Sequence, residues 1–388
     1  MQISLLTGNV DPHYQLDLLS GLVAAGLEVD FIGSDAMEGA PILSHRNVHF
    51  YNLRGSQDTK ASMQEKIFRI LKYYFKLIHY TLKTNSQIFH IQWENKFIYF
   101  DRTIMNLFYK LLGKKLVFTV HNVNAGERDE NDTVLNRLSL KFKYMIADHI
   151  IVHTDKMKLQ MVTDFNINEK KISVIPHGIN TVIPQTELTP SEAKKRLNLN
   201  YNEKVLLFFG NIAPYKGLKT LINALIKLKN STSNFKLIIA GKIKGNEAHW
   251  NEIKDVIEKH KLSDYIIEQV RFIPDEEVEI YYKAADILIL PYNYIFQSGV
   301  LFVSYSFGLP AIASDVGSLK EDIIEGKTGF ICLPENPDDL AEKIIQYFQS
   351  DLYKKLPESR KHILEFAQEK YSWEKIGKKT SSVYQSLL

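Results

Sequence analysis

Short runs of consecutive apolar, largely β-branched residues recur along the whole chain and alternate with segments of helical periodicity. Strands with one solvated face alternate apolar and polar residues, so continuous apolar runs predict parallel strands that are covered on both faces. The first half contains ISLLTGN, EVDFIG, VHFYNL, QIFHIQW, KLVFTVHN, HIIVHT and KISVIPHG, and the second half KVLLFFGN, FKLIIAGK, IIEQVRFI, DILILPY, PAIASD and TGFICLP.

The two series of strands and helices predict an α/β chain with two doubly wound, Rossmann-like domains. The polar stretch 179–203 separates them and is expected to be the linker, with a capping-box helix start at TPSEA inside it. One large continuous sheet is the alternative. Thirteen strands exceed what open sheets usually hold, which favours two sheets.

Length and composition agree with two cytoplasmic globular domains. The 388 residues exceed one ordinary core, and the hydrophobic content is 45%. The net charge of +3 gives no argument for a nucleic-acid partner. The single cysteine, Cys332, excludes an internal disulfide and is typical of a reducing compartment. The N-terminal apolar run is too short for a signal peptide, and no apolar run has the length of a membrane span.

Candidate ligand-binding residues follow three strands of the second half. Ligands of doubly wound sheets bind at the carboxyl ends of strands, where helix N-termini also lie. Gly210 and Asn211 follow the strand KVLLFF, and Lys216 opens the next amphipathic helix. Gly241 follows FKLIIA, where a missing side chain lets a flat ring lie against the backbone. These positions predict that the second domain binds an anionic ligand.

The segment from Gln297 to Val300 lies at the start of an apolar helix after the strand DILILPY. The amides of Ser298, Gly299 and Val300 fall in its first turn, where they lack intrahelical partners and lie at the positive end of the helix dipole. They therefore form a candidate phosphate site, which Gly299 lets a ligand approach closely. The alternative is that Ser298 is only an N-cap. A nearby cation, Lys216, favours a diphosphate, the leaving group of a sugar nucleotide.

Seven segments of the sequence, given at the end of this paragraph in chain order, together resemble the GT-B glycosyltransferases of the large retaining family called family four. The resemblance covers nearly the whole chain and implies two domains facing a cleft, with the nucleotide-sugar on the C-terminal domain and the acceptor on the N-terminal one. It implies domains of residues 1–180 and 181–369, with the C-terminal helix, 370–388, returning to the first. The segments are VFTVHN, VIPHGIN, FGNIAPYKGLKTLINA, VRFIPDEEVEIYYKAADILILPY, FGLPAIASDVGSLKEDI, EGKTGFIC and YSWEKIGKKTSSVY.

The sequence departs from the family pattern at three positions. Asn211 stands where the family usually has an arginine, whereas Lys216 matches the family lysine. Ile295 and Val303 stand where the family usually has two glutamates, one near the donor sugar and one near the ribose. The QSGV arrangement resembles a branch found in polysaccharide biosynthesis and is interpreted as a variant site.

The resemblance also implies a mechanism. Charge developing on the diphosphate would be stabilised by Lys216, by the Ser298–Val300 amides and by Asn211, with no metal and no cofactor. The leaving phosphate is expected to take the acceptor proton on the same face. The family counterpart of His121 contacts the donor sugar, and a core or capping histidine is the alternative.

Other candidate residues carry weaker signals. Asn9 and His13 lie on the first strand-to-helix loop, where they could meet the acceptor, although an exposed loop histidine is equally expected. His149 and His153, four apart in a strand, do not have the spacing of a metal site. No Asp-x-Asp follows a predicted strand, and the acidic segment 127–132 is expected to be a solvated loop.

Residues 60–115 carry eleven basic against three acidic residues, and the helix predicted over 66–83 is the most distinctive part. An anionic membrane surface, nucleic acid and an ordinary solvated face all compete as explanations, and nucleic acid is weakest because no recognition motif is present. At 100° per residue the helix has a basic and an apolar face, the latter expected to pack on the sheet. Phe68 and Phe75 flank the basic face on one side, Tyr73 and Tyr80 on the other. The basic face comprises Arg69, Lys72, Lys76, His79 and Lys83, the apolar face Ile67, Ile70, Leu71, Tyr74, Ile78 and Leu82.

These observations predict a hexosyltransferase that uses a nucleotide-sugar and a glycan or lipid-linked glycan acceptor. Two alternatives remain. A non-catalytic GT-B partner subunit is favoured by the missing glutamates and disfavoured by His121 and Lys216. A nucleotide-sugar epimerase would act on the donor without any acceptor.

Overall fold

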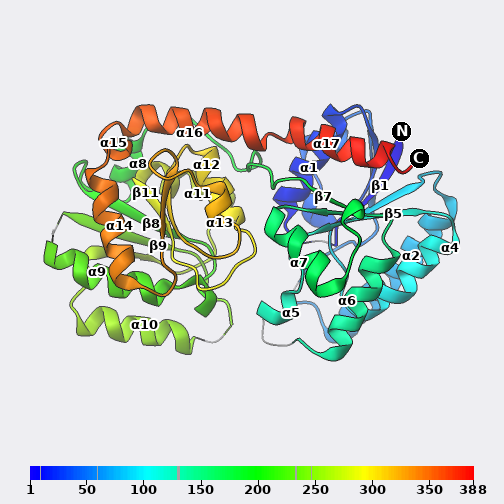
Figure 1. Cartoon of the computed structure of the whole chain (residues 1–388), viewed down its shortest axis with the longest axis horizontal. Coiled ribbons are helices and arrows are strands. Elements are labelled where there is room, and N and C mark those ends of the chain that lie inside the picture. Colours follow the sequence, from blue (N-terminus) through cyan, green and yellow to red (C-terminus); the bar gives the residue numbers. More distant parts are fainter. Residues whose placement is uncertain (9, 59, 129–131, 232–233, 246) are drawn as a thin grey trace. The chain divides into compact units, whose positions relative to one another are not determined.

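The computed structural model describes residues 1–8, 10–58, 60–128, 132–231, 234–245 and 247–388 (Figure 1). Contacts divide the chain into two compact units. The first unit comprises residues 1–178 and 371–388, and the second unit residues 179–370. Each unit is an α/β fold around its own parallel sheet, which confirms the predicted fold class and excludes one continuous sheet.

The first unit contains a seven-stranded sheet in the order β3-β2-β1-β4-β5-β6-β7, with every pairing parallel. Most strand residues are buried, as strands covered on both faces require. The order places β1 and β4 at the centre and β5, β6 and β7 on one side. The strands are β1 (Gln2–Leu6), β2 (Glu28–Gly33), β3 (Val48–Asn52), β4 (Ile88–Ile91), β5 (Lys115–Val120), β6 (His149–Val152) and β7 (Ile172–Val174).

The helices of the first unit include the C-terminal helix of the chain. A π-helical turn at Asp101–Met105 joins α3 to α4, and short 3₁₀ turns occupy Asp35–Met37, Pro41–Ser44 and Glu169–Lys171. The α-helices are α1 (Pro12–Ala24), α2 (Met63–Lys83), α3 (Ile98–Phe100), α4 (Asn106–Leu111), α5 (Ala125–Arg128), α6 (Val134–Ile146), α7 (Asp155–Phe165) and α17 (Trp373–Gln385).

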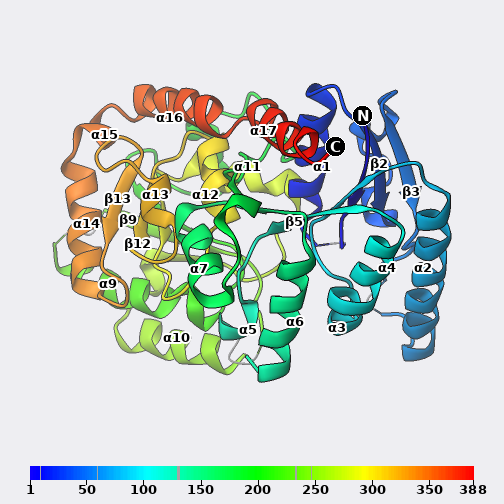
Figure 2. The ribbon, with the colours of Figure 1, turned by 45° about the vertical axis from the view of Figure 1, so that its right-hand side comes forward.

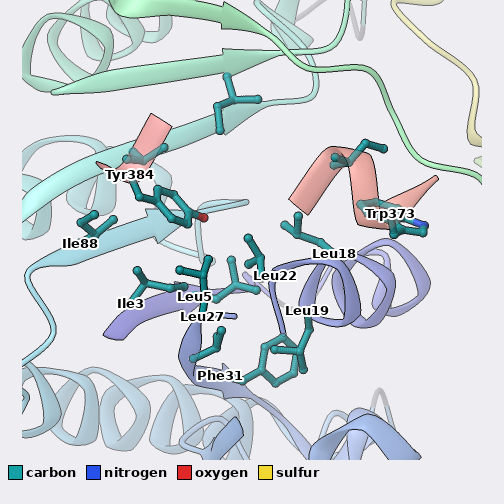
Figure 3. Close-up of a cluster of buried hydrophobic side chains, with 14 of the residues drawn as sticks. Ile3, Leu5, Leu18, Leu19, Leu22, Leu27, Phe31, Ile88, Trp373 and Tyr384 are labelled. Atoms are coloured by element: carbon teal, nitrogen blue, oxygen red, sulfur yellow. The ribbon is translucent and has the colours of Figure 1, made fainter. Parts of the chain in front are cut away.

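Helix α17 completes the core of the first unit by packing on α1. Trp373 and Tyr384 of α17 join a buried cluster with Leu18 of α1 and strand residues of the sheet (Figure 3). The two helices approach closely at Gly377, where an added Cβ would overlap the carbonyl oxygen of Gly21. The C-terminal segment is therefore an integral part of this unit.

The second unit contains a six-stranded parallel sheet in the order β10-β9-β8-β11-β12-β13. Its strands are β8 (Lys204–Phe209), β9 (Phe235–Ala240), β10 (Ile266–Gln269), β11 (Ile287–Leu290), β12 (Ala311–Ser314) and β13 (Gly329–Cys332). Its α-helices are α8 (Pro190–Arg196), α9 (Leu218–Ser231), α10 (Ala248–Lys259), α11 (Asp275–Ala284), α12 (Gly299–Ser306), α13 (Leu319–Asp322), α14 (Pro337–Gln349), α15 (Asp351–Lys354) and α16 (Leu356–Tyr371). Its 3₁₀ turns are η5 (Pro214–Lys216) and η6 (Ser263–Tyr265).

The prediction for the apolar face of α2 was wrong except at Tyr74, which is buried. The buried face consists of Tyr73, Tyr74, Leu77, Tyr80 and Thr81, and Ile67, Leu71 and Leu82 of the predicted apolar face are 48%, 58% and 61% exposed. The physical reason is that tyrosine hydroxyls satisfy buried carboxylates: Tyr80 donates to Asp30 at 2.5 Å and Tyr74 to Asp101 at 2.8 Å.

The outward face of α2 is therefore both apolar and basic. Phe68 and Phe75 are 66% and 74% exposed. Lys72 and Lys83 are also exposed. Tyr74 contacts Phe97 and Phe100, so α2 lies beside α3 (Figure 2). None of the helices in the described ranges combines the length and apolar character needed to cross a bilayer.

Candidate active site

The candidate donor site of the second unit forms where β8, β9 and β11 end. Gly210 follows β8 and its amide donates to the carbonyl of Ala240 at 2.9 Å. Gly241 follows β9 with φ +148°, and an added Cβ would overlap the carbonyl oxygen of Gly210. A Cβ on Gly210 would lie 3.5 Å from Cγ2 of Val300. The fold thus brings the ends of β8 and β9 and the start of α12 together.

Lys216 reaches the same place from the 3₁₀ turn η5. Its side chain is buried, and its ammonium lies 3.9 Å from the centroid of the Tyr292 ring. The turn fits closely because Gly217, at φ +66°, leaves room for the carbonyl oxygen of Pro291. The Tyr292 hydroxyl lies 3.3 Å from Oγ of Ser298. Lys216 and Ser298 therefore contact the same aromatic side chain.

The start of α12 has the geometry of a helix end open to an anion. Ser298 occupies the N-cap position, but its side chain makes no capping hydrogen bond. Ordinary N-cap serines accept from a first-turn amide, so the N-cap alternative does not account for this residue. A Cβ on Gly299 would meet nothing within 4 Å. The helix start is therefore open on the side where a side chain at residue 299 would project, and the positive end of the helix dipole lies at the same end.

Two further residues complete the predicted donor set. The amide Nε2 and Oε1 of Gln297 are both buried and have no hydrogen-bond partner among the described residues. Buried amides are almost always hydrogen-bonded, so this side chain is suited to bind a polar ligand group. Asn211, directly after Gly210, is half-buried. Ile295 and Val303, in the places of the family glutamates, are also half-buried, so neither place supplies a carboxylate.

In the first unit, His121 follows β5 and belongs to an aromatic cluster. Its ring stacks on that of Trp93 with centroids 3.9 Å apart and an interplanar angle of 1°. Tyr14 of α1 packs edge-on at 4.7 Å. Nε2 of His121 lies 3.4 Å from Oε1 of Gln92, a long contact. The ring is therefore fixed in orientation by its neighbours.

Three further histidines, His90, His153 and His177, lie in this cluster, and all are neutral. Burial lowers the pKa of His90 and of His153 to about 3, and that of His177 to about 4. Burial and the adjacent His153 and His177 hold the pKa of His121 well below its usual value. A neutral imidazole has one donor and one acceptor nitrogen, so His121 is suited to hydrogen bonding rather than to charge stabilisation.

The sequence reasoning missed most of this cluster. His153 and His177 end the segments HIIVH and VIPH, and Gln92 and Trp93 follow β4. Their common signal is a position just after a parallel strand, the same signal that marks Gly210 and Gly241 in the second half of the chain. His149, by contrast, contacts Ser173 through Nε2 at 2.8 Å.

The predicted acceptor residues are less well defined. Asn9 lies outside the described residues, as do 129–131 of the acidic segment. His13 lies in the first turn of α1, next to Tyr14, and is half-buried. In the described part of the chain, no group of three or more His, Cys, Asp or Glu residues is arranged to hold a metal ion.

Family models match both units. The model for glycosyltransferase family 4 matches residues 13–182, and the model for group 1 glycosyl transferases matches residues 190–370. Together with the two parallel-sheet α/β units, these matches define a glycosyltransferase fold. The chain belongs to the GT-B glycosyltransferases.

Among curated relatives, an uncharacterized glycosyltransferase of Methanocaldococcus jannaschii is 30% identical over 264 residues, 66% of each chain. A D-inositol 3-phosphate glycosyltransferase of Corynebacterium glutamicum is 25% identical over 286 residues, 69% of this chain and 66% of that protein. A second uncharacterized glycosyltransferase of M. jannaschii is 27% identical, and the match covers 59% of its length. The chain thus matches 59–66% of the length of these relatives.

Solved structures agree with the fold over the full length. A sucrose-phosphate synthase of Thermosynechococcus elongatus has a TM-score of 0.78 at 20% identity, covering 100% of this chain and 99% of that one. Anabaena HepE in complex with UDP-glucose has a TM-score of 0.75 at 15% identity, covering 100% of both chains. At this identity the likeness establishes the GT-B fold alone.

Proposed function

We propose that the protein transfers a hexosyl unit from a nucleotide-sugar to a glycan or lipid-linked glycan in polysaccharide or glycoconjugate biosynthesis, with retention of anomeric configuration. The observation that carries the proposal is that Lys216 and Ser298 both contact Tyr292. The ammonium of Lys216 lies over the Tyr292 ring, and the Tyr292 hydroxyl lies next to Oγ of Ser298, the N-cap residue of α12. A buried cation and a helix N-terminus converge on one place. Such a place is suited to a diphosphate leaving group.

The chemistry follows from where negative charge develops. Breaking the anomeric bond adds one negative charge to the β-phosphate of the nucleoside diphosphate, and Lys216 and the amides of Gly299 and Val300 stabilise it. Asn211 and Gln297 supply further hydrogen bonds to the donor, while Gly210 and Gly241 let its flat and anionic parts approach the backbone. Because protein groups provide this positive charge, the reaction is proposed to proceed without a metal or a cofactor. The leaving phosphate accepts the acceptor proton on the same face of the sugar.

His121 is proposed to contact the donor sugar through a neutral imidazole. His13 is a candidate acceptor residue because it adjoins Tyr14, which packs against His121. UDP-glucose is the first donor to test, since HepE was solved in complex with it. Phosphorylated acceptors belong in the same screen because the C. glutamicum relative is named for D-inositol 3-phosphate.

The outward face of α2 is proposed to bind the cytoplasmic surface of an anionic membrane. Phe68, Leu71 and Phe75 are each more than half exposed, and Lys72, Lys76 and Lys83 share that helix. Exposed aromatics between lysines suit a headgroup interface, where each Lys contributes about 1 kcal/mol. An acceptor linked to lipid would be presented at such a surface.

A single assay tests the function and separates the alternatives. The purified chain is incubated with a panel of nucleotide-sugars, and both melting temperature and sugar release are measured. A glycosyltransferase is stabilised by its donor and hydrolyses it slowly, with faster turnover when acceptor is added. The absent glutamates favour a non-catalytic partner subunit, which would show no hydrolysis. An epimerase would convert the sugar without releasing it.

A further inference from the structure

A pocket of about 470 Å³ lies in the first unit, and its lining includes none of the residues assigned above to the donor or the acceptor. It is formed by the segment after β3, the first half of α2 and the segment after β4. Both strands are parallel and end at the same edge of the sheet, the edge at which doubly wound folds bind ligands. Its volume is in the range of small-molecule sites.

The pocket carries an excess of positive charge. Arg54, Lys66, Arg69 and Lys96 line it, against the single carboxylate of Asp58. None of these four cations forms an ion pair within the described ranges of the chain. Clustered cations repel one another, and an anion bound among them would relieve that repulsion.

Two polar groups at the pocket have no partner. Nε and Nη2 of Arg54 and Oδ1 of Asn95 are buried, yet none makes a hydrogen bond to another described residue. Cζ of the guanidinium instead lies 4.4 Å from the centroid of the Tyr73 ring. A buried guanidinium edge without an acceptor is destabilising, and oxygen atoms of a bound anion would satisfy it.

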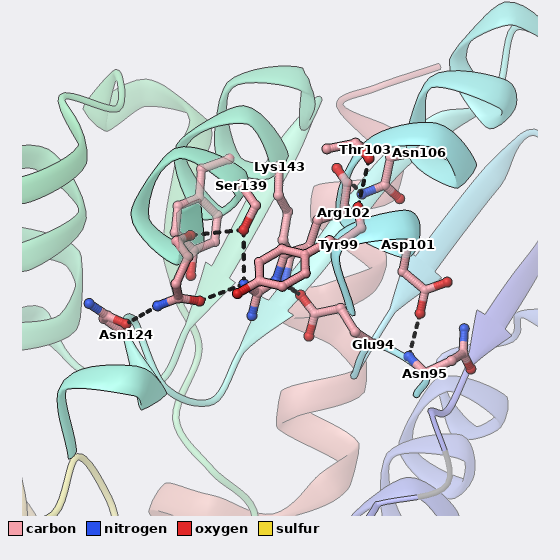
Figure 4. Close-up of polar contacts among 12 residues, drawn as sticks. Glu94, Asn95, Tyr99, Asp101, Arg102, Thr103, Asn106, Asn124, Ser139 and Lys143 are labelled. Carbon is pink, nitrogen blue, oxygen red and sulfur yellow. Dashed lines mark hydrogen bonds and ion pairs between the residues drawn. The ribbon is translucent and has the colours of Figure 1, made fainter. Parts of the chain in front are cut away.

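The walls of the pocket are held in place by polar contacts. Arg69 donates to the carbonyls of Ser56 at 2.8 Å and Asp58 at 3.1 Å, which fixes the loop after β3. The backbone amide of Asn95 donates to the carboxylate of Asp101 (Figure 4). These contacts hold the pocket lining in position before any ligand arrives.

The segment after β4 is anchored by a second buried contact. Glu94 accepts from Lys143 at 2.6 Å and from Arg102 at 3.3 Å, as Figure 4 shows. Burial alone would raise the pKa of Glu94, but these two cations lower it to about 2. The carboxyl group of Glu94 is therefore ionised at neutral pH. The segment after β4, which carries Asn95 and Lys96, is therefore held in place independently of the loop after β3.

We propose that this pocket binds a phosphate or diphosphate group of the acceptor. Arg54 presents a buried donor edge, Lys66 and Lys96 add charge, and Met63 and Ile70 cover the apolar part of the ligand. Naming the ligand as the acceptor rests on the proposed function, whereas the anion site itself does not. The phosphate can belong to a soluble acceptor or to a lipid-linked one.

Calorimetric titration with inorganic phosphate at low salt tests the site. Wild type should bind phosphate saturably, and the Arg54→Gln/Lys96→Gln double variant should bind at least tenfold more weakly. Lys170→Gln, in the 3₁₀ turn before β7, is the matched control and should bind as wild type. Lys216→Ala removes the donor-site cation and should leave this binding intact. Equal binding by the double variant, or loss only in Lys216→Ala, would overturn the proposal.

Two further measurements make the result unambiguous. If Arg54→Gln lowers the melting temperature, Lys66→Gln/Lys96→Gln replaces it, and unchanged phosphate binding in that folded variant overturns the site. Vesicles carrying polyprenyl phosphate distinguish the sources: sedimentation that free phosphate competes away indicates a lipid-linked acceptor, and binding of soluble phosphate alone indicates a soluble one. Sugar release from the donor is scored separately, so failure of the pocket and failure of the proposed transfer remain distinguishable.

Discussion

Nε2 of His153 lies 3.0 Å from Nδ1 of His121, and this contact fixes the proton position on His121. Nδ1 of His153 lies 3.0 Å from the carbonyl oxygen of Ile175, so it must carry the proton. The low pKa of His153 leaves the ring neutral, and its Nε2 therefore accepts. His121 then donates through Nδ1, and its Nε2, 3.4 Å from Oε1 of Gln92, carries the lone pair.

His153 is thereby predicted to be a positioning residue. His153→Phe should lower kcat for transfer about tenfold while leaving the affinity for nucleoside diphosphate unchanged, because His121 loses its acceptor. His153→Gln retains an acceptor oxygen and should recover part of the rate. His121→Ala should impair transfer more than either, again with little effect on nucleotide binding. A parallel loss of binding and melting temperature in His121→Ala would point to a core histidine instead.

The same histidines predict a pH-dependent stability of the first unit. Folded-state pKa values of about 3 to 4 for His90, His153 and His177 lie below the unfolded value near 6.5. The unfolded chain therefore binds protons first, and the stabilisation present above pH 6.5 is lost as pH falls, by about 1.4 kcal/mol per histidine and pH unit.

The melting temperature should accordingly decrease from pH 7 to pH 5. His90 is held by Thr119 at 2.7 Å and by the Tyr384 hydroxyl at 2.5 Å. His90→Gln should thus lower the melting temperature at pH 7 yet flatten its dependence on pH. A slope equal to that of wild type would exclude His90 as a contributor.

Added side chains at Gly299 and Gly241 should have opposite effects on folding stability and on nucleotide binding. Gly299→Val fills open space, so the melting temperature should stay near that of wild type while nucleoside diphosphate binding is lost. Gly241→Ala, the control, forces a Cβ against the Gly210 carbonyl at a positive φ and should destabilise the second unit. Thermal shift with and without nucleotide measures both effects. Stabilisation of Gly299→Val by nucleotide, equal to that of wild type, would remove α12 from the phosphate site.

The apolar pattern of the sequence was sufficient to predict the strands but not the exposed face of a helix. Every predicted strand is present, and most of them are covered on both faces, so that the apolar signal is carried at each position. On α2, apolar residues surround much of the helix, so periodicity could not choose between Leu71 and Tyr73 as the buried side chain. That choice was made by Asp30 and Asp101, distant carboxylates that require tyrosine hydroxyls.

The candidate site was also predictable only in part: the backbone positions could be predicted, and the aromatic side chains could not. Gly210, Gly241 and Gln297–Val300 lie at strand and helix ends, so their convergence follows from the topology of a doubly wound sheet. Tyr292 and Trp93 could not be assigned, since nothing local in the sequence shows which ring lies under Lys216 or against His121. The role of His153 could not be predicted from its spacing to His149, because its partner, His121, follows the neighbouring strand β5.

The outward face of α2 predicts salt-sensitive binding to anionic vesicles. The Lys72→Glu/Lys76→Glu variant should lose co-sedimentation, because charge reversal removes attraction without touching the buried tyrosines. Phe75→Ser should weaken binding at high salt as well, since its ring contributes apolar area. Lys170→Glu, in the 3₁₀ turn before β7, is a matched control and should bind as wild type. Binding that persists in the double variant, or is absent from wild type at low salt, would contradict the membrane proposal.

Sugar release from the donor by Lys216→Ala, measured under single-turnover conditions, tests the central claim most directly. Lys216 is buried against Tyr292, whereas Lys219 lies nearby on α9, half-exposed and paired with Glu252, and serves as the control. Lys216→Ala should lower the rate by about a hundredfold or more with a wild-type circular dichroism spectrum, because the departing diphosphate loses its cation. Lys219→Ala should match wild type. A Lys216→Ala rate equal to that of wild type would contradict the assignment of this residue to the leaving group.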